Sequence, residues 1–197
     1  MNIYYTDGSP VTCANNLDDY RLVMAIPQVT QLLMLVHISA DRKLVSKGGK
    51  LLPIGGAYTA HLQWARKSKS NYTWLKHHYT ALTVEYEFRF GREHRYKKFL
   101  ENFREPPHIA EEGKFEAPPN CARDEKGTVN YTHEDRTLVA YRMLLKHCWS
   151  AALSRKKSTL GWTKTLPPAW WPDWTKYAEA RRNANALARR SAREIVG

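Results

Sequence analysis

The stretch "SNYTWLKHHYTALTVEYEFRF", residues 70–90, carries the most informative helical pattern in the chain, and Gly91 directly after it is placed to end a helix. At 3.6 residues per turn, one face of this helix collects five side chains: Trp74, His78, Leu82, Glu85 and Arg89. The apolar members indicate that the face is at least partly buried. The stretch therefore predicts a buried carboxylate and guanidinium four residues apart, which is the spacing of an ion pair.

The polar residues of this face have two interpretations. A buried charge persists only when it is paired or used, because stranding it costs a large part of the stability of a domain. An ion pair between Glu85 and Arg89 that only holds the fold is the first interpretation. The second is acid–base catalysis, because His78 lies on the same face and three convergent polar groups suit proton transfer.

The elements before this helix are predicted from turn and cap signals. Residues 2–6 are expected to form a short strand that the turn signal "DGSP" ends. Asn16 is placed as the N-cap of a long helix, with Asp19 at the capping-box position. Pro27 removes one backbone donor, so it is expected to kink this helix or restart it.

The remaining segments are predicted to be helices separated by loops. Residues 41–57 are expected to be a loop, and a helix is expected from about Ala57. A shorter helix is expected within residues 92–103, and a long surface loop over residues 104–131. Thr132 is placed as the cap of a helix that extends to about residue 155. The sequence thus predicts a mainly α, single-domain helical fold with at most a short N-terminal strand or hairpin.

Composition limits the class of protein. A net charge of +12 over 197 residues favours an anionic partner such as nucleic acid, although a basic protein without such a ligand is the alternative. The apolar run at residues 32–38 is far too short to span a bilayer. The three cysteines are widely separated, which favours a reducing compartment, so we expect a cytoplasmic protein. The residues demand no metal and no organic cofactor.

Further polar groups are candidates for binding. Arg21, Gln28 and Gln31 form a polar edge beside the apolar stripe of the first long helix, whereas Asp18 and Asp19 fit a helix cap. Arg142 and Lys146 lie one turn apart, which suits a phosphate or pyrophosphate clamp, although a solvated basic face is the commoner explanation.

The C-terminal part of the chain is rich in arginine and tryptophan. Its arginines suit contacts with duplex phosphates: Arg181, Arg182, Arg189 and Arg190. Trp170 and Trp171 either stack on bases or fasten a loop to the core. We therefore expect a catalytic helical domain over residues 1–175, followed by a basic helix over residues 176–197 that belongs to it or extends it towards DNA.

Five segments in this order resemble a known family: "NLDDYRLVMAIPQVTQLLMLVH", "WARKSKSNYTWL", "EYEFRFGREH", "VAYRMLLKH" and "PAWWPDW". They resemble a phage and bacterial family labelled pyrimidine-dimer DNA glycosylase. That family is similar in turn to the α-glutamyl/putrescinyl-thymidine pyrophosphorylases, or amino acid:DNA transferases. The resemblance covers about residues 1–175 and implies a phage enzyme that modifies a thymine-derived base in DNA.

The resemblance implies site residues where the family motifs fall on this chain. The acid-rich opening of the family falls on residues 17–21, which makes Asp19 and Arg21 candidates. The later motifs fall on Gln31, Trp64, Asn71, Trp74, Glu85, Arg89, Tyr141, Arg142 and Lys146. Trp64 and Trp74 are expected to form a wall of the site or to stack on a base. Tyr141 is a further candidate for stacking on the base.

Departures from the family pattern favour transfer over base excision. The family has a lysine and a glutamate where this chain has Met24 and Gln28. Its histidine before the Trp64 motif is displaced or absent here, with His61 the nearest candidate. Excision by β-elimination needs an amine nucleophile and a carboxylate. The resemblance therefore implies attack of a free amino acid or amine on 5-(pyrophosphoryloxymethyl)uracil in DNA, with loss of pyrophosphate.

Three functions follow from these expectations. In the preferred one, Arg21, Arg89, Arg142 and Lys146 hold the pyrophosphate, and Glu85, aided by Asp19 or replaced by His78, takes the proton of the ammonium. The alternatives are a pyrimidine-dimer-type DNA glycosylase or lyase and a DNA-binding paralogue without activity. The expected partners are DNA with a modified pyrimidine and a free amine, and no membrane.

Overall fold

A computed structural model shows a mainly α-helical fold and describes residues 2–38, 60–103, 112–124, 126–155, 160–173, 175–177 and 179. Its elements are α1 (Pro10–Asn16), α2 (Asp19–Ile38), α3 (Ala60–Lys67), α4 (Lys69–Phe90), the 3-10 helix η1 (Lys97–Phe103) and α5 (Thr137–Leu153). Among the described residues there is no strand, only an isolated bridge between Arg123 and Asn130. The predicted fold class is confirmed.

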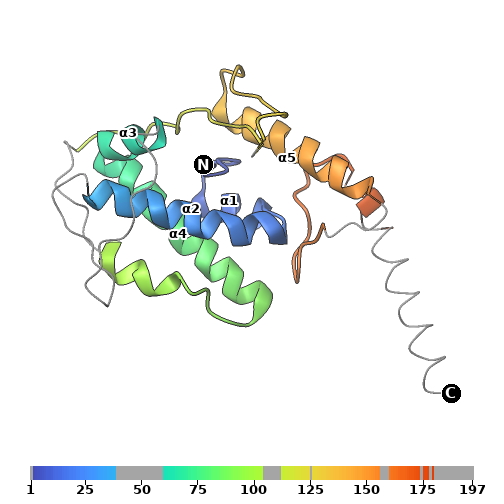
Figure 1. Cartoon of the computed structure of the whole chain (residues 1–197), viewed down its shortest axis with the longest axis horizontal. Coiled ribbons are helices and arrows are strands. Elements are labelled where there is room, and N and C mark those ends of the chain that lie inside the picture. The colour runs from blue at the N-terminus through green and yellow to red at the C-terminus, as the bar shows by residue number, and fades with distance from the viewer. Residues whose placement is uncertain are drawn as a thin grey trace.

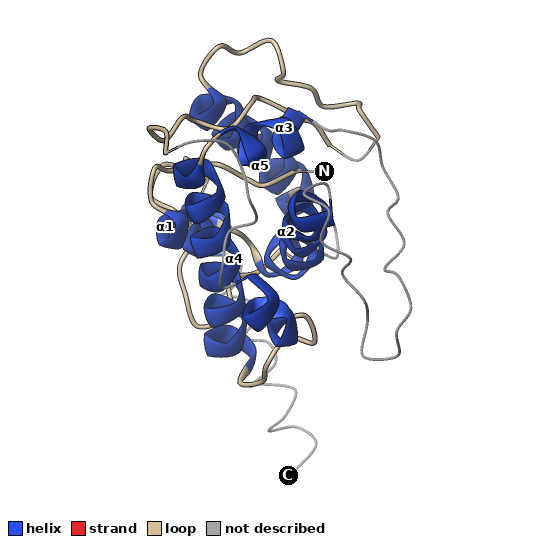
Figure 2. Cartoon of the chain, turned by 90° about the vertical axis from the view of Figure 1, so that its left-hand side faces the viewer, coloured by secondary structure: helices blue, strands red, loops and turns tan. Residues whose placement is uncertain are grey.

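Helix α4 is the element against which the other N-terminal helices pack. Both α1 and α2 pack against it, with α2 crossing it at an angle, and α3 contacts it, as Figure 1 and Figure 2 show. Ser68 caps its first turn by accepting a hydrogen bond from the backbone N–H of Asn71 at 3.1 Å. Gly91 ends it in the left-handed conformation at φ 66°, which confirms the predicted stop.

The beginning of the chain differs from its prediction. Residues 2–6 are extended but pair with no strand, and Figure 1 shows them entering the centre of the molecule between α2 and α5. The predicted turn is followed at once by α1, which Ser9 caps and Pro10 opens, so a short helix was missed. Asn16 is the last residue of α1, and its predicted role as N-cap of the next helix is wrong.

Helix α2 starts at Asp19 and continues to Ile38 without restarting at Pro27. The hydroxyl of Thr30 donates to the carbonyl oxygen of Ile26 at 2.7 Å inside this continuous segment. By length and composition α2 is apolar enough to cross a membrane, yet 61% of its most apolar window is buried inside the protein. This burial is consistent with the core helix of a soluble protein.

Helix α5 is shorter at its start than predicted. Thr132 lies in a turn, and the helix begins at Thr137 after Arg136, which makes no side-chain cap. The segment of residues 112–131 is irregular where it is described, as expected for the predicted loop. The predicted loop at residues 41–57 and the predicted helix start at Ala57 lie outside the described residues.

Aromatic side chains fasten the segment after α5 to the core. Trp149 of α5 contacts Trp162, Trp170 and Trp171 with ring centroids 5.0–5.4 Å apart. Trp162 and Trp171 are buried, so stacking of Trp171 on an exposed base is excluded in this structure, and its interpretation as a loop anchor is favoured.

Candidate functional site

The predicted pairing of Glu85 with Arg89 is present and is part of a larger charge network, which we define as Glu85, Arg89 and Asp19. The Nε of Arg89 donates to Oε1 of Glu85 at 2.6 Å, and its Nη1 donates to Oδ1 of Asp19 at 3.1 Å. The Arg89 side chain is completely buried and that of Glu85 is nearly so, whereas the Asp19 carboxylate is 22% exposed.

The same guanidinium also ends helix α1. Its Nη1 donates to the carbonyl oxygen of Leu17 at 2.7 Å, and its Nη2 donates to that of Asn15 at 3.1 Å. With its amide nitrogen turned towards Glu85, Asn15 donates to Oε2 at 3.0 Å. Arg89 therefore joins α4, α1 and the start of α2, and every nitrogen of its guanidinium has a protein partner.

Asp19 is equally engaged. Its carboxylate accepts hydrogen bonds from the backbone N–H of Thr163 at 3.0 and 3.1 Å and from the Thr163 hydroxyl at 2.8 Å. Its own backbone N–H donates to the carbonyl oxygen of Gly161 at 2.8 Å. These contacts fasten the segment around residue 162 to the start of α2, which is a structural use of this acid.

His78 lies apart from the charge network. Its Nε2 is 2.9 Å from the carbonyl oxygen of Ile3, and its Nδ1 is 3.3 Å from that of Pro10. Complete burial lowers the pKa of His78 to about 4, so the ring is neutral at pH 7. The structure thus makes His78 a bridge between α4 and the N-terminal segment, and the three polar groups of the predicted face do not converge.

The aromatic candidates are also largely internal. Trp64 and Trp74 are buried, and their indole N–H groups donate to the carbonyl oxygens of Glu116 and Gly8. Asn71 donates to the carbonyl oxygen of Trp64 and accepts from the backbone N–H of Glu116, both at 2.9 Å. Trp74 also lines an open cleft of about 760 Å³, and its predicted role in a site wall stays a prediction.

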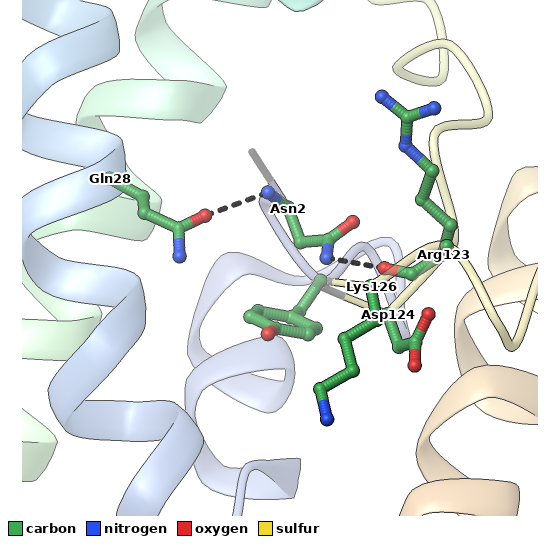
Figure 3. Close-up of a pocket in the computed structure, with 7 residues that line it drawn as sticks. Asn2, Gln28, Arg123, Asp124 and Lys126 are labelled. Atoms are coloured by element: carbon green, nitrogen blue, oxygen red, sulfur yellow. Dashed lines mark hydrogen bonds between the residues drawn. The ribbon is translucent and has the colours of Figure 1, made fainter.

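A polar pocket lies between helix α2, the N-terminal segment and the loop at residues 122–131. Its volume is about 370 Å³, and Figure 3 shows how its side chains are arranged. We define the polar pocket by its lining residues: Asn2, Tyr4, Gln28, Arg123, Asp124, Lys126 and Gly127. Of the predicted site residues, only Gln28 lines it.

Hydrogen bonds fix the frame of the polar pocket. The backbone N–H of Asn2 donates to Oε1 of Gln28 at 2.8 Å, and its side-chain nitrogen donates to the carbonyl oxygen of Arg123 at 2.9 Å (Figure 3). Oδ1 of Asp124 accepts from the backbone N–H of Val129 at 3.0 Å, which closes the loop. Asn2 therefore joins α2 to the loop.

Several functional groups of the pocket have no partner among the described residues. These are the side-chain nitrogen of Gln28, Oδ2 of Asp124, the guanidinium of Arg123 and the ammonium of Lys126. Figure 3 shows the Arg123 and Lys126 side chains extending to opposite sides of Asn2. The buried Oδ1 of Asn2 is also without a hydrogen-bond partner in the described part of the chain.

Strain occurs at the floor of the same pocket. Tyr4 has a φ of 50°, a left-handed conformation that costs a non-glycine residue about 1–3 kcal/mol. Its ring packs edge-on against Tyr141, with centroids 6.1 Å apart. Strained backbone of this kind concentrates at binding and catalytic sites. Sequence reasoning missed this residue, because an isolated tyrosine carries no sign of its backbone angle.

Tyr141 and Arg21 lie next to the pocket without lining it. The hydroxyl of Tyr141 is 3.4 Å from Nε2 of His61, and burial lowers the pKa of His61 to about 4. Arg21 donates to Oδ1 of Asp18 at 2.9 Å. Burial alone lowers the pKa of Arg21, but the Asp18 carboxylate more than compensates and raises it above its ordinary value.

The other predicted residues lie elsewhere. Arg142 and Lys146 stand over the ring of Trp170, outside the residues that line the polar pocket. Gln31 is half-buried on α2. The predicted phosphate contacts Arg181, Arg182, Arg189 and Arg190 lie outside the described residues. No group of three metal-binding side chains occurs in the residues that the structure describes.

Comparisons of the chain with protein-family models, with curated proteins and with solved structures found no match. The resemblance carried by the five sequence segments therefore stays a prediction. Function is inferred below from the contacts and charges of the described residues.

Proposed function

We propose that the protein is a phage enzyme that modifies a thymine-derived base in DNA, and that its reaction takes place in the polar pocket. The observation that carries the proposal is the composition of this pocket. Two cations, one carboxylate oxygen and the side-chain nitrogen of one amide, none of these groups with a partner among the described residues, line about 370 Å³. A pocket of this size suits a small ligand, and polar groups of both signs suit a transfer reaction.

The proposed reaction is the transfer of a free amino acid or amine to 5-(pyrophosphoryloxymethyl)uracil in DNA. The amine nitrogen forms a bond to the methylene carbon, and the bond from this carbon to the pyrophosphate oxygen breaks. The pyrophosphate leaves with the electron pair, and the ammonium loses one proton. The reaction needs a site for an anion and a proton acceptor, but no oxidant or reductant.

Arg123 and Lys126 supply the anion site in this proposal. A leaving pyrophosphate gains negative charge in the transition state, and fixed cations stabilise that charge. Asp124 supplies the proton acceptor, because its Oδ2 has no partner in the described part of the chain while Val129 holds its Oδ1. This assignment moves the chemistry away from Glu85, whose carboxylate is engaged by Arg89 and Asn15.

The target base has to leave the duplex to enter the polar pocket, as for other enzymes that act on bases. The side-chain nitrogen of Gln28 offers a donor for the polar edge of a pyrimidine. We place the protein in the host cell cytoplasm, where the phage DNA is modified.

Mass spectrometry of nucleosides tests the proposal. DNA containing pyrophosphorylated hydroxymethyluracil is incubated with the full chain and a pool of amino acids, and is then digested. We expect a nucleoside whose mass equals that of thymidine plus the amine less two hydrogen atoms, together with one pyrophosphate per product. Unchanged substrate in the presence of all amines would contradict the proposal.

A DNA glycosylase or lyase is the second candidate. The observation that favours it is the presence of an amine and a carboxylate, Lys126 and Asp124, in one pocket, since β-elimination chemistry needs both groups. Borohydride treatment with abasic DNA is expected to trap an adduct only if this candidate is right. Loss of the adduct in Lys126→Gln, with the exposed Lys98→Gln as control, would identify the amine.

A further inference from the structure

A second basic site lies on helix α5, next to the tryptophan cluster. The Cζ atom of Arg142 is 5.3 Å from the centroid of the Trp170 ring, and Nζ of Lys146 is 5.9 Å from the same centroid. Both side chains are half-buried, and neither lines the polar pocket. We call these three residues the basic platform.

Trp170, the tryptophan of the basic platform, packs against Trp149 of α5. Its ring stacks on that of Trp149 at a centroid distance of 5.4 Å and an interplanar angle of 23°. Trp149 is completely buried, and its indole N–H donates to Oδ1 of Asp18 at 2.7 Å. Trp149 cannot move without breaking its hydrogen bond to Asp18, so its position is fixed. Trp170 stacks on it and is therefore a rigid support for the two cations.

Arg142 is fixed further by the N-terminal segment. Its Nε donates to the carbonyl oxygen of Thr6 at 2.9 Å, and its Nη2 lies 3.6 Å from Oδ2 of Asp7. The Arg142 and Asp7 side chains are 30% and 34% exposed, so their mutual attraction is screened by water. One side of the guanidinium thus sets its position, and Nη1 makes no hydrogen bond within the described residues.

Lys146 has no carboxylate within 4 Å among the described residues, although it lies one helical turn from Arg142. Two like charges at this spacing destabilise a helix by about 0.2–0.5 kcal/mol. With Asp7 included, the cluster keeps a net charge of +1. The two cations repel each other, and the rigid aromatic support keeps them close together. An anion bound between them would stabilise this arrangement.

We infer that the basic platform binds a phosphodiester group of the DNA backbone, outside the polar pocket. The inference rests on the proposed function, because it takes DNA as the substrate. The planar guanidinium suits two oxygens of one phosphate, and the ammonium of Lys146 adds a point charge. The contact carries no base information, so its effect is to dock the duplex while the polar pocket receives the base.

Salt-dependent DNA binding tests this inference. Fluorescence anisotropy with an unmodified duplex gives the association constant over a series of KCl concentrations, for the wild type and for Arg142→Gln/Lys146→Gln. Loss of one phosphate contact makes the slope of log K against log [KCl] shallower by about 0.9. We expect at least this change in the double variant, and weaker binding at low salt for every duplex sequence.

Matched control cations exist elsewhere in the chain. Arg95 lies 5.0 Å from the Tyr96 ring centroid, and Lys98 lies 5.3 Å from that of Phe99, so both are exposed cations over aromatic rings. Arg95→Gln/Lys98→Gln removes the same charge and the same type of contact. An equal decrease in slope in this variant would overturn the inference, because total charge alone would then explain the binding.

The single variant Lys146→Gln is included because the double variant could misfold. The Lys146 side chain makes no hydrogen bond among the described residues, so its replacement should leave the fold intact. A wild-type slope in a folded Lys146→Gln and in the double variant would overturn the inference while leaving base modification intact. Absence of duplex binding by the wild type would overturn the DNA substrate as well. If inorganic pyrophosphate inhibits the double variant less while DNA binding stays unchanged, the platform binds pyrophosphate instead, and the inference is wrong.

Discussion

The charge network lies at the start of helix α2, at Asp19, and the polar pocket lies beside Gln28 of the same helix, but the two use their charged groups in opposite ways. Every guanidinium nitrogen of Arg89 has a protein partner, and Glu85 and Asp19 each accept at least two hydrogen bonds. In the polar pocket, Arg123, Lys126 and Oδ2 of Asp124 have no partner among the described residues. The difference teaches that a buried charged cluster is not by itself a site for chemistry.

Energetics explain why the two regions differ. A buried ion is stable only when its lone pairs and protons have hydrogen-bond partners. In such a network the protein itself supplies these partners, so no polar group remains to bind a ligand. A binding pocket needs the reverse, since its groups have to gain partners when the ligand arrives. Four predictions follow this contrast, in order of decreasing effect.

Asp124→Asn is expected to have the largest effect on the reaction. Removal of a general base lowers the rate by about 10²–10⁴-fold, while Asn keeps the Oδ1 acceptor for the N–H of Val129. The amine incorporation rate from nucleoside mass spectrometry checks this expectation. The exposed Asp135→Asn is the control and should keep the wild-type rate. Equal rates in the two variants would remove Asp124 as the base.

Arg89→Met is expected to have the largest effect on stability. It leaves Glu85 and Asp19 without their cation and removes the donors for two carbonyl oxygens, at a cost of about 3–5 kcal/mol. Urea unfolding checks the free energy of unfolding. Arg92→Met, at an exposed position next to Gly91, should change it by less than about 0.5 kcal/mol. A stable Arg89→Met protein would mean that the network does not hold the fold.

Acid is expected to unfold the protein through its buried histidines. Burial lowers the pKa of His78 and of His61 from 6.5 to about 4, so the unfolded chain binds more protons between these pH values. Stability is then complete above pH 6.5 and is lost as the pH falls towards 4, by about 3 kcal/mol for each histidine.

Urea midpoints at a series of pH values measure this loss. His78→Gln should be less stable than the wild type at pH 7 but should lose less on acidification, because one of the two groups is absent. His77→Gln changes the neighbouring exposed residue and should keep the wild-type pH dependence. An unchanged pH dependence in His78→Gln would contradict the assignment.

Arg123→Gln and Lys126→Gln are expected to have the smallest effect, on substrate affinity. A hydrogen bond to a charged group contributes about 1.5–3 kcal/mol, so each variant should raise KM by about 10- to 160-fold. The exposed Arg92→Gln should leave KM unchanged. KM values within a factor of two for all three variants (about 0.4 kcal/mol) would show that the pocket does not bind the anion.

The sequence predicts the buried helix well, because local signals control it. Gly91 ends α4 as predicted, and the spacing of Glu85 and Arg89 yields the observed ion pair, whereas the helix begins at Lys69 after Ser68 rather than at residue 70. Helix α1 was missed, and the predicted caps of α2 and α5 were wrong, since Asn16 and Thr132 also satisfy cap patterns and only tertiary contacts decide which pattern is used.

Of the residues that line the polar pocket, only Gln28 was predicted from the sequence as a candidate for binding. Gln28 stood out on the polar edge of α2, but Arg123, Asp124 and Lys126 lie in an irregular loop without periodicity. Their approach to α2 depends on the hydrogen bonds of Asn2, which link residues 26 and 121 positions apart in the chain. Such long-range contacts leave no local pattern in the sequence, and neither does the strained backbone of Tyr4.

The most direct test of the central claim, that the chemistry belongs to the polar pocket and not to the charge network, is the rate of amine incorporation by Glu85→Gln. It is measured beside Asp124→Asn, at a temperature where both variants are folded. We predict that Glu85→Gln keeps most of the wild-type rate, because Gln still accepts from Nε of Arg89, while Asp124→Asn loses it. Loss of incorporation in folded Glu85→Gln, with a wild-type rate in Asp124→Asn, would contradict the account.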